Sequence, residues 1–186
     1  VLDRQSQRLR KLTEDLVEAS KASTGNLPVS PAPTDLNVLL SQVCGEYQQR
    51  LEDQVLEPVL ALCQPGPVAM ADGRLLWRVL DNLMSNICKY AMPGTRVYLS
   101  TEAGEDGVRM VVKNISRYPL NISADELTER FVRGDSSRST EGSGLGLSIA
   151  TSLTAIQGGD FRLTIDGDLF KVTLTLPRAE QEEKQE

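Results

Sequence analysis

The sequence contains no histidine, and this absence excludes more than any other feature of its composition. Acid–base catalysis by histidine, a zinc site with histidine ligands and a phosphohistidine formed within the chain all require a residue that is not present. No residue of this chain can therefore serve as a phosphate-accepting histidine.

Cysteine and long apolar runs are also scarce. Cys44, Cys63 and Cys88 are odd in number and form no close-spaced metal pattern, which favours a reducing cytosol. No apolar run approaches the roughly 20 residues of a membrane span, and no segment resembles a signal peptide. Because Val1 falls inside a charged periodic stretch and is not a methionine, we interpret the chain as a cytoplasmic fragment of a longer protein.

The net charge of −6 argues against nucleic acid as a partner, so an anionic ligand would have to be held by local features. The 186 residues, 40% of them hydrophobic and 25% charged, predict one globular domain with an additional element.

The first 21 residues show a heptad pattern formed by Leu2, Leu9 and Leu16. Such a stripe predicts a helix that packs in a hairpin or a dimeric bundle; the alternative is an amphipathic helix folded onto the main domain. Residues 22–33 are rich in Ser, Gly, Asn and Pro and indicate a linker. We therefore divide the chain into residues 1–30, a domain over 31–178 and a disordered acidic tail over 179–186.

Periodicity and turn residues predict helices over 36–51, 72–91 and 145–156. Strands are expected over 55–63, 96–101, 108–113, 161–165 and 170–176. These elements predict an α+β fold, a two-layer α/β sandwich in which a mixed sheet has helices on one face, preceded by one long helix.

One helix carries a polar stripe opposite its apolar arc, formed by Arg78, Asn82, Asn86 and Lys89. Asparagine is a mediocre helix former, so two of them at this spacing call for a reason. A side-chain amide oxygen suits Mg²⁺, and an ammonium three residues on can meet a phosphate. The alternative is a solvated helix face.

Residues 141–150 read EGSGLGLSIA, with glycines at alternate positions before an apolar helix. Glycine allows close backbone approach, and a helix N-terminus offers N–H donors and positive potential, which together favour phosphate binding. The alternative is a plain glycine-rich turn. The Lys and spacing of a P-loop are missing.

Residues 82–90 resemble the N box of sensor histidine kinases, and residues 142–150 resemble their second glycine box. Residues 131–138, FVRGDSSR, are similar to the F box, and residues 4–16 are similar to the second helix of the dimerisation and phosphotransfer bundle. The resemblance spans about residues 1–177. It implies the ATP-binding fold that this family shares with gyrase-type ATPases, Hsp90 and MutL.

Carried over by residue, the resemblance implies that Asn86 ligates Mg²⁺, Asn82 lies near the phosphates, Lys89 meets a phosphate and Tyr90 packs beside the nucleotide. It further implies that the polyphosphate is held by the glycine-box residues Gly142, Ser143, Gly144, Leu145, Gly146 and Leu147.

One departure from the family pattern concerns the base. Asn114 stands where the family has an Asp that reads adenine, and Ser116 and Tyr118 replace glycines, which predicts a stiffer hinge. An amide oxygen can still accept the adenine amino hydrogen without charge assistance. The alternative is that Asn114 is a turn residue at a strand end.

Residues 115–141 are long and polar and suit a mobile lid over a ligand. Ser123 to Glu126 has the form of a capping box, and Phe131 is suited to latch the lid. Arg133 and Arg138 are expected to neutralise the γ-phosphate, unless each is simply solvated.

The function implied by the resemblance is ATP- and Mg²⁺-dependent phosphorylation of a histidine on a bundle helix that this chain lacks, followed by transfer to a response regulator. The full-length protein would be a homodimer anchored in the bacterial membrane. The rival interpretations are a serine or threonine kinase of the anti-sigma type, a gyrase-like ATPase, and a regulatory pseudokinase that only binds nucleotide.

Overall fold

The computed structural model describes residues 24–120 and 146–180 and isolated positions between residues 6 and 21. Those isolated positions are helical, and Arg10 Nε donates to Glu14 Oε1 over 3.0 Å, one turn further on. The heptad positions Leu2, Leu9 and Leu16 lie outside the described residues. The bundle helix therefore stays a prediction.

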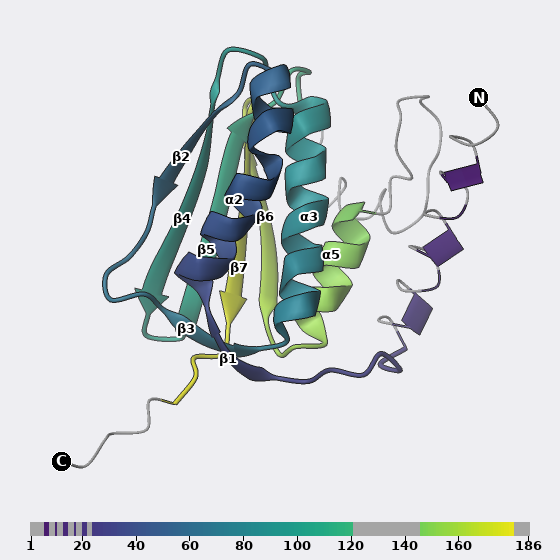
Figure 1. Ribbon diagram of the computed structural model, residues 1–186, viewed down its shortest axis with the longest axis vertical. Coiled ribbons are helices and arrows are strands. Elements are labelled where there is room, and N and C mark those ends of the chain that lie inside the picture. Colours follow the sequence, from purple (N-terminus) through teal and green to yellow (C-terminus); the bar gives the residue numbers. More distant parts are fainter. Residues whose placement is uncertain are drawn as a thin grey trace.

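A five-stranded mixed sheet forms one layer of the domain (Figure 1). Its strands are arranged in the order β2 (Glu57–Ala61), β4 (Arg96–Gly104), β5 (Gly107–Ile115), β7 (Leu169–Leu176) and β6 (Asp160–Asp166). β2 is parallel to β4, and all other neighbours are antiparallel. β7 therefore lies between β5 and β6, although it follows β6 in the chain.

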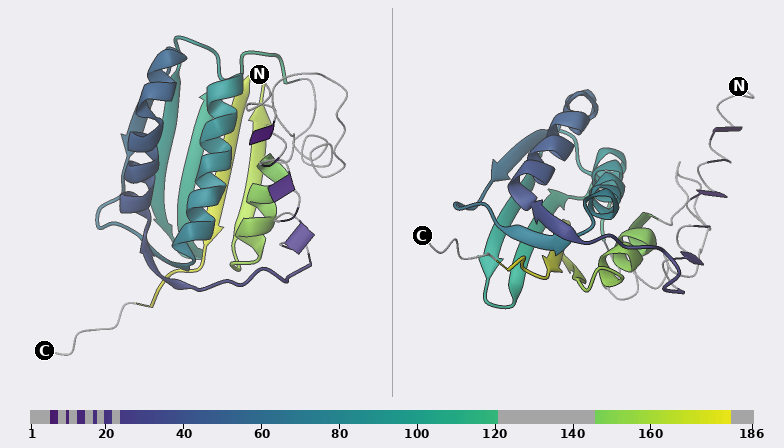
Figure 2. Two further views of the ribbon diagram at one scale, coloured as in Figure 1. Left: turned by 45° about the vertical axis from the view of Figure 1, so that its right-hand side comes forward. Right: turned by 60° about the horizontal axis from the view of Figure 1, so that its bottom comes forward.

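Three helices form the second layer, α2 (Leu36–Asp53), α3 (Gly73–Tyr90) and α5 (Gly146–Ala155). Figure 2 shows them side by side on a single face of the sheet. The predicted fold class, a two-layer α/β sandwich with a mixed sheet, is confirmed. Within the described part of the chain, none of the helices has the length and apolarity needed to cross a membrane.

The core lies between the two layers. Alternate residues of the central strands are buried against the helices, which is the pattern of a sheet covered on one face. These residues are Val97, Leu99, Val108, Met110, Val112, Val172, Leu174 and Leu176. The helices contribute Leu36, Leu40, Leu51, Leu76, Leu80, Leu83, Ile149 and Leu153, all at most 2% exposed.

The central helix α3 agrees closely with the prediction of a helix over residues 72–91. Asp72 caps its N-terminus by accepting from the backbone N–H groups of Arg74 and Leu75, and Ala91 ends it in extended conformation. The buried residues recur every three or four positions, as the sequence pattern requires. They are Leu75, Leu76, Val79, Leu80, Leu83, Met84 and Ile87.

A two-stranded sheet, β1 (Ala32–Asp35) with β3 (Val68–Ala71), was not predicted from the sequence. Its two strands have four residues each and are poor in β-branched and aromatic side chains, so neither stands out by propensity. The prediction of a linker over 22–33 is therefore wrong at its end, where β1 begins at Ala32.

The strand predicted over 55–63 is shorter than expected. Helix α2 continues to Asp53, Val55 has a positive φ of 56°, and β2 begins only at Glu57. At the other end of the domain, Ala179 is 4% exposed and donates its N–H to Val68 O over 2.9 Å. Residues 181–186 of the predicted tail lie outside the described residues, and the division into domains stays a prediction.

The Asp72 carboxylate joins three parts of the chain at the start of α3. It is 3% exposed and accepts from Ser30 N over 3.0 Å and from Arg74 N over 3.0 Å, while Asp72 N donates to Gln157 Oε1 over 2.9 Å. Burial alone would raise the pKa of this carboxyl, but the hydrogen bonds from Ser30, Arg74 and Leu75 together lower it. Asp72 thus fastens the segment before β1 to the helical layer.

We expect Asp72→Ala to lower the free energy of unfolding by about 2–3 kcal/mol, because it removes a helix cap and leaves Ser30 N without its acceptor. Asp35 caps α2 in the same way but is exposed, so Asp35→Ala is the matched control and should cost only about 1 kcal/mol.

Since the pKa of Asp72 is lowered in the folded state, the contribution of Asp72 to stability is present at neutral pH. It is lost as the pH falls through that pKa. Urea unfolding of both variants at pH 7 and at acid pH measures this, and equal losses for the two would contradict it.

Candidate functional site

A cavity of about 170 Å³ opens between the end of α3, the end of β5 and the start of α5. It gathers residues that are far apart in the sequence, and four of them, Asn86, Tyr90, Asn114 and Leu147, were predicted to contact a nucleotide. The complete lining is Asn86, Ile87, Tyr90, Asn114, Ser116, Tyr118, Leu120, Leu147 and Phe170.

The cavity is mostly apolar, with amide groups on two sides. Ile87 comes from α3, Leu147 from α5 and Phe170 from β7, while Asn86 and Asn114 contribute the amides. None of the described lining residues carries a charged side chain. A flat apolar ring with a few polar edges fits such a wall better than an ion does.

Asn114 is a buried residue of the cavity lining. It is 5% exposed and is paired with Phe170 across the β5–β7 ladder, which fixes its backbone. Its Nδ2 donates to Ile115 O over 3.2 Å. Asn114 is thus a buried amide beside an apolar cavity, as the base-reading interpretation requires.

The end of α3 is bonded to the end of β5 by backbone groups. Met92 N donates to Ile115 O and Arg117 N donates to Tyr90 O, each over 2.8 Å, and Ala91 forms a bridge with Ser116. The side of the cavity that carries Tyr90 and Asn114 is therefore held together by main-chain hydrogen bonds.

Ser116 and Tyr118, which replace glycines of the family pattern, form a tight turn at the mouth of the cavity. Ser116 Oγ donates to Tyr118 O over 2.8 Å and lies 3.3 Å from Tyr118 N, which donates to it. The Tyr118 side chain is 56% exposed. The turn is consistent with a stiff connection here, although hinge stiffness itself stays a prediction.

Helix α5 begins directly against the two asparagines of α3. A Cβ on Gly146 would lie 3.3 Å from Asn82 Oδ1 and 3.8 Å from Asn86 Oδ1. Asn82 is itself held, because its Nδ2 donates to Arg78 O over 3.0 Å. A side chain at this position would be tightly packed against Asn82, and the N-terminal end of α5 lies beside both amides. The first N–H groups of a helix have no partner within it and favour an anion.

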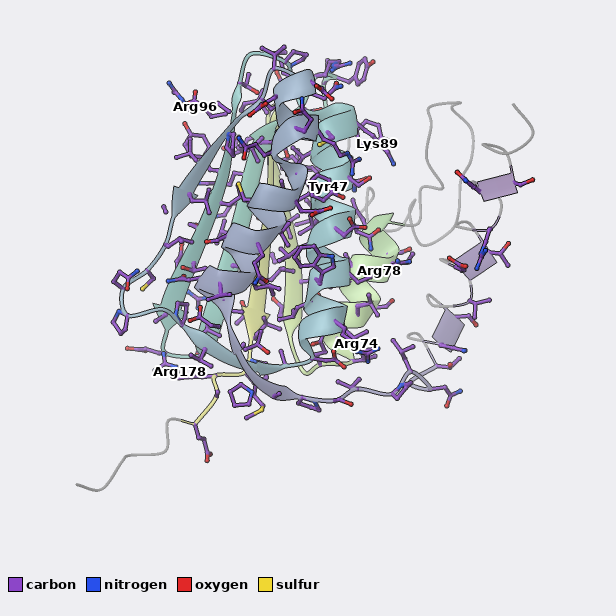
Figure 3. All side chains as sticks on the ribbon, viewed as in Figure 1. Tyr47, Arg74, Arg78, Lys89, Arg96 and Arg178 are labelled. Carbon is purple, nitrogen blue, oxygen red and sulfur yellow. The ribbon has the colours of Figure 1, made fainter. Side chains whose placement is uncertain are left out.

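Other predicted residues are not in the cavity lining. Asn82 lies beside Gly146, and Lys89 is an exposed residue of α3. Figure 3 shows Lys89 and Arg78 projecting from the flank of α3 that is turned away from α2. The remaining candidates lie outside the described residues: Arg133, Arg138, Gly142, Ser143, Gly144 and Leu145, together with the lid segment and Phe131.

Five lining residues were not assigned to the site from the sequence. Ile87 and Phe170 appeared only as core positions of a helix and a strand, whereas Ser116, Tyr118 and Leu120 lay in the predicted lid. The alternation of Phe170 with Val172 shows which face Phe170 shares, but only the strand order β5-β7-β6 brings it to Asn114.

An apolar cavity at the end of a mixed sheet, with a glycine-started helix against two amides, defines a nucleotide-binding type of α/β sandwich. Residues 71–180 match the family described as histidine kinase-, DNA gyrase B- and HSP90-like ATPases. The chain belongs to this family, and the resemblance drawn from its motifs is confirmed.

Among curated proteins, the sensor protein PcoS of Escherichia coli is 30% identical over 173 residues, which cover 91% of this chain and 36% of PcoS. The chain thus spans about a third of that relative's length. Among solved structures, full-length ShkA in complex with AMPPNP has a TM-score of 0.78 at 27% identity, over 95% of this chain and 37% of that one. The histidine kinase AdeS of Acinetobacter baumannii has a TM-score of 0.77 at 21% identity, over 96% and 83%, and supports the fold alone.

Proposed function

We propose that this chain binds Mg-ATP in the described cavity and forms the kinase part of a two-component sensor histidine kinase. Its γ-phosphoryl acceptor is a histidine outside this chain, from which the group passes to a response regulator. The full-length protein is a membrane-anchored homodimer, and this part lies in the cytoplasm. The observation that carries the proposal is the start of α5 at Gly146, set against Asn82 and Asn86 beside an apolar cavity that ends on Asn114.

The residues present fit a magnesium nucleotide. The purine ring occupies the apolar cavity between Ile87, Leu147 and Phe170, with Asn114 at its exocyclic edge. The phosphates extend toward the N-terminal end of α5, where backbone N–H groups and the Asn82 amide are available. Asn86 lines the cavity and its Oδ1 is near Gly146, which supports the proposal that its amide oxygen would ligate Mg²⁺.

The contribution of the chain to the reaction is positioning. Bound Mg²⁺ supplies charge neutralisation for the phosphates. The chain orients the nucleotide through its base and presents the terminal phosphate at the start of α5. An acceptor held in line with that phosphate then reacts without the entropic cost of bringing the two groups together. Arg133 and Arg138 of the predicted lid add positive charge at that end.

We expect Gly146→Ala to weaken Mg-ATP binding roughly tenfold, because the new methyl group presses on Asn82 and shifts its amide at the phosphate end. Gly146 is the first residue of α5, and a shift of the side-chain amide of Asn82 can relieve the contact, so the free energy of unfolding should change by less than about 1 kcal/mol. Calorimetric titration with Mg-ATP and urea unfolding measure the two effects.

Gly45 serves as the matched control, since a Cβ there meets nothing within 4 Å and the residue lies inside α2. Gly45→Ala should leave Mg-ATP affinity unchanged. If the parent chain binds no Mg-ATP, the kinase proposal is wrong and the chain uses this fold to bind a partner. If Gly146→Ala binds as the parent does, the phosphates lie elsewhere.

A further inference from the structure

The residue placed at the exocyclic edge of the base is an amide, and an amide has a donor and an acceptor. Asn114 is a buried polar side chain in the lining of the cavity, on a backbone fixed by the β5–β7 ladder. Its oxygen accepts a hydrogen bond from a 6-amino group, and its nitrogen donates one to a 6-oxo group. A carboxylate in the same place could only accept.

The orientation of this amide is set by one hydrogen bond, which uses only one of the two hydrogens on Nδ2. Nδ2 donates to Ile115 O over 3.2 Å, which is at the long end of the N–H···O range. Ile115 O also accepts from Met92 N over 2.8 Å. A half-turn about χ2 would bring Oδ1 against Ile115 O, two acceptors, so the amide keeps this orientation and offers a ligand both Oδ1 and the second hydrogen of Nδ2.

The neighbouring Ser116 hydroxyl does not distinguish a 6-amino group from a 6-oxo group. The Ser116 hydroxyl is used within its own turn, donating to Tyr118 O and accepting from Tyr118 N. Ile87, Leu147 and Phe170 contact a purine through its faces and edges without distinguishing its 6-substituent. Among the described side chains, Asn114 is thus the one that determines whether a 6-amino or a 6-oxo group is accepted.

From this geometry we infer that the cavity accepts 6-oxopurine nucleoside triphosphates as well as ATP, and that Asn114 sets this breadth. The inference rests on the proposed nucleotide-binding function and names its substrate class. It requires no movement of the backbone, since Oδ1 and the second hydrogen of Nδ2 are both available in this one orientation.

The test is a comparison of Mg-ATP with Mg-ITP by calorimetric titration of the chain. ITP carries an oxygen at the 6-position in place of the amino group and has the same sugar and phosphates. We expect the two dissociation constants of the parent to differ by less than about fivefold. In Asn114→Asp, whose carboxylate faces the 6-oxygen as a second acceptor, ATP should be preferred by about tenfold or more.

A preference of the parent for ATP of about fivefold or more overturns the inference and leaves the proposed function intact. An unchanged ratio in Asn114→Asp overturns the role of Asn114. If the chain binds neither Mg-ATP nor Mg-ITP, both the proposed function and the inference are wrong. Thermal unfolding reports whether the buried carboxylate of Asn114→Asp is tolerated; if this variant does not fold, the ratio measured on the parent alone decides.

Discussion

Replacing Asn86 by alanine is expected to weaken Mg-ATP binding by about 10- to 100-fold while leaving the domain as stable as before. Asn86 is half-buried, lines the cavity and lies across from Gly146, where the proposed base and phosphate halves of the site would meet. Its side chain is not among the buried groups of α3, so the apolar arc that packs on the sheet is untouched. The loss arises from a missing amide ligand, and alanine itself favours the helix.

Replacing Asn37 by alanine is expected to have the opposite effect, a loss of stability without a loss of Mg-ATP affinity. Its Nδ2 donates to Cys63 O over 2.9 Å and its Oδ1 accepts from Thr101 Oγ1 over 2.6 Å, which ties α2 to the sheet far from the cavity. Asn37→Ala should lower the free energy of unfolding by about 1–3 kcal/mol with unchanged Mg-ATP affinity. Titration and urea unfolding of both variants separate ligand binding from folding.

The metal dependence gives a second check on Asn86. In EDTA the parent and Asn86→Ala should bind ATP with similar, weaker affinity, because the difference between them lies in a metal ligand. Equal Mg-ATP affinity in the two proteins would remove Asn86 from the site. A difference that persists without metal would assign it a direct contact with the nucleotide.

Incubated with γ-labelled ATP, the chain alone is expected to acquire no phosphohistidine, and a histidine-bearing helical hairpin added separately is expected to become labelled. The first half follows from a histidine count of zero, which no rearrangement can change. The second follows because the nucleotide site is proposed to be complete, so that supplying the acceptor restores an in-line pair. Transfer between separate molecules lacks the effective concentration of a covalent link and should be slow and concentration-dependent.

Acid treatment identifies the product, since phosphohistidine is acid-labile and phosphoserine is not. The hairpin with its histidine replaced by glutamine, and the Asn86→Ala chain with the intact hairpin, are the two controls, and both should remain unlabelled. Acid-stable label on the chain alone would contradict the histidine-kinase proposal and favour the serine or threonine kinase of the same fold family.

Elements were predicted most accurately from the sequence where a long regular pattern included the residues that mark its first and last positions. Helix α3 was placed to within one residue at each end, because its apolar spacing is regular and Asp72 is a recognisable cap. The paired strands β4 and β5 were identified from the turn at residues 103–107, although both extend further than predicted. Local signals of this kind do not depend on the rest of the chain.

The sequence predicted least where structure depends on distant partners. β1 and β3 are strands because Pro33 is aligned with Met70 and Asp35 with Val68, not because either segment favours extended structure. In the same way, Phe170 reaches the cavity through its pairing with Asn114, which lies 56 positions earlier in the chain. Motifs therefore identified the ends of the cavity, while its apolar lining required the order of the strands.

The backbone hydrogen bonds between the end of α3 and the end of β5 also affect how a ligand would first contact the cavity. Met92 N to Ile115 O and Arg117 N to Tyr90 O are main-chain bonds, so the base side of the cavity exists before any ligand arrives. Association with a preformed surface is limited by diffusion and orientation, whereas ordering a segment around a ligand adds a slower step. If the chain binds a nucleotide as proposed, its purine ring would meet a surface whose main-chain bonds already exist.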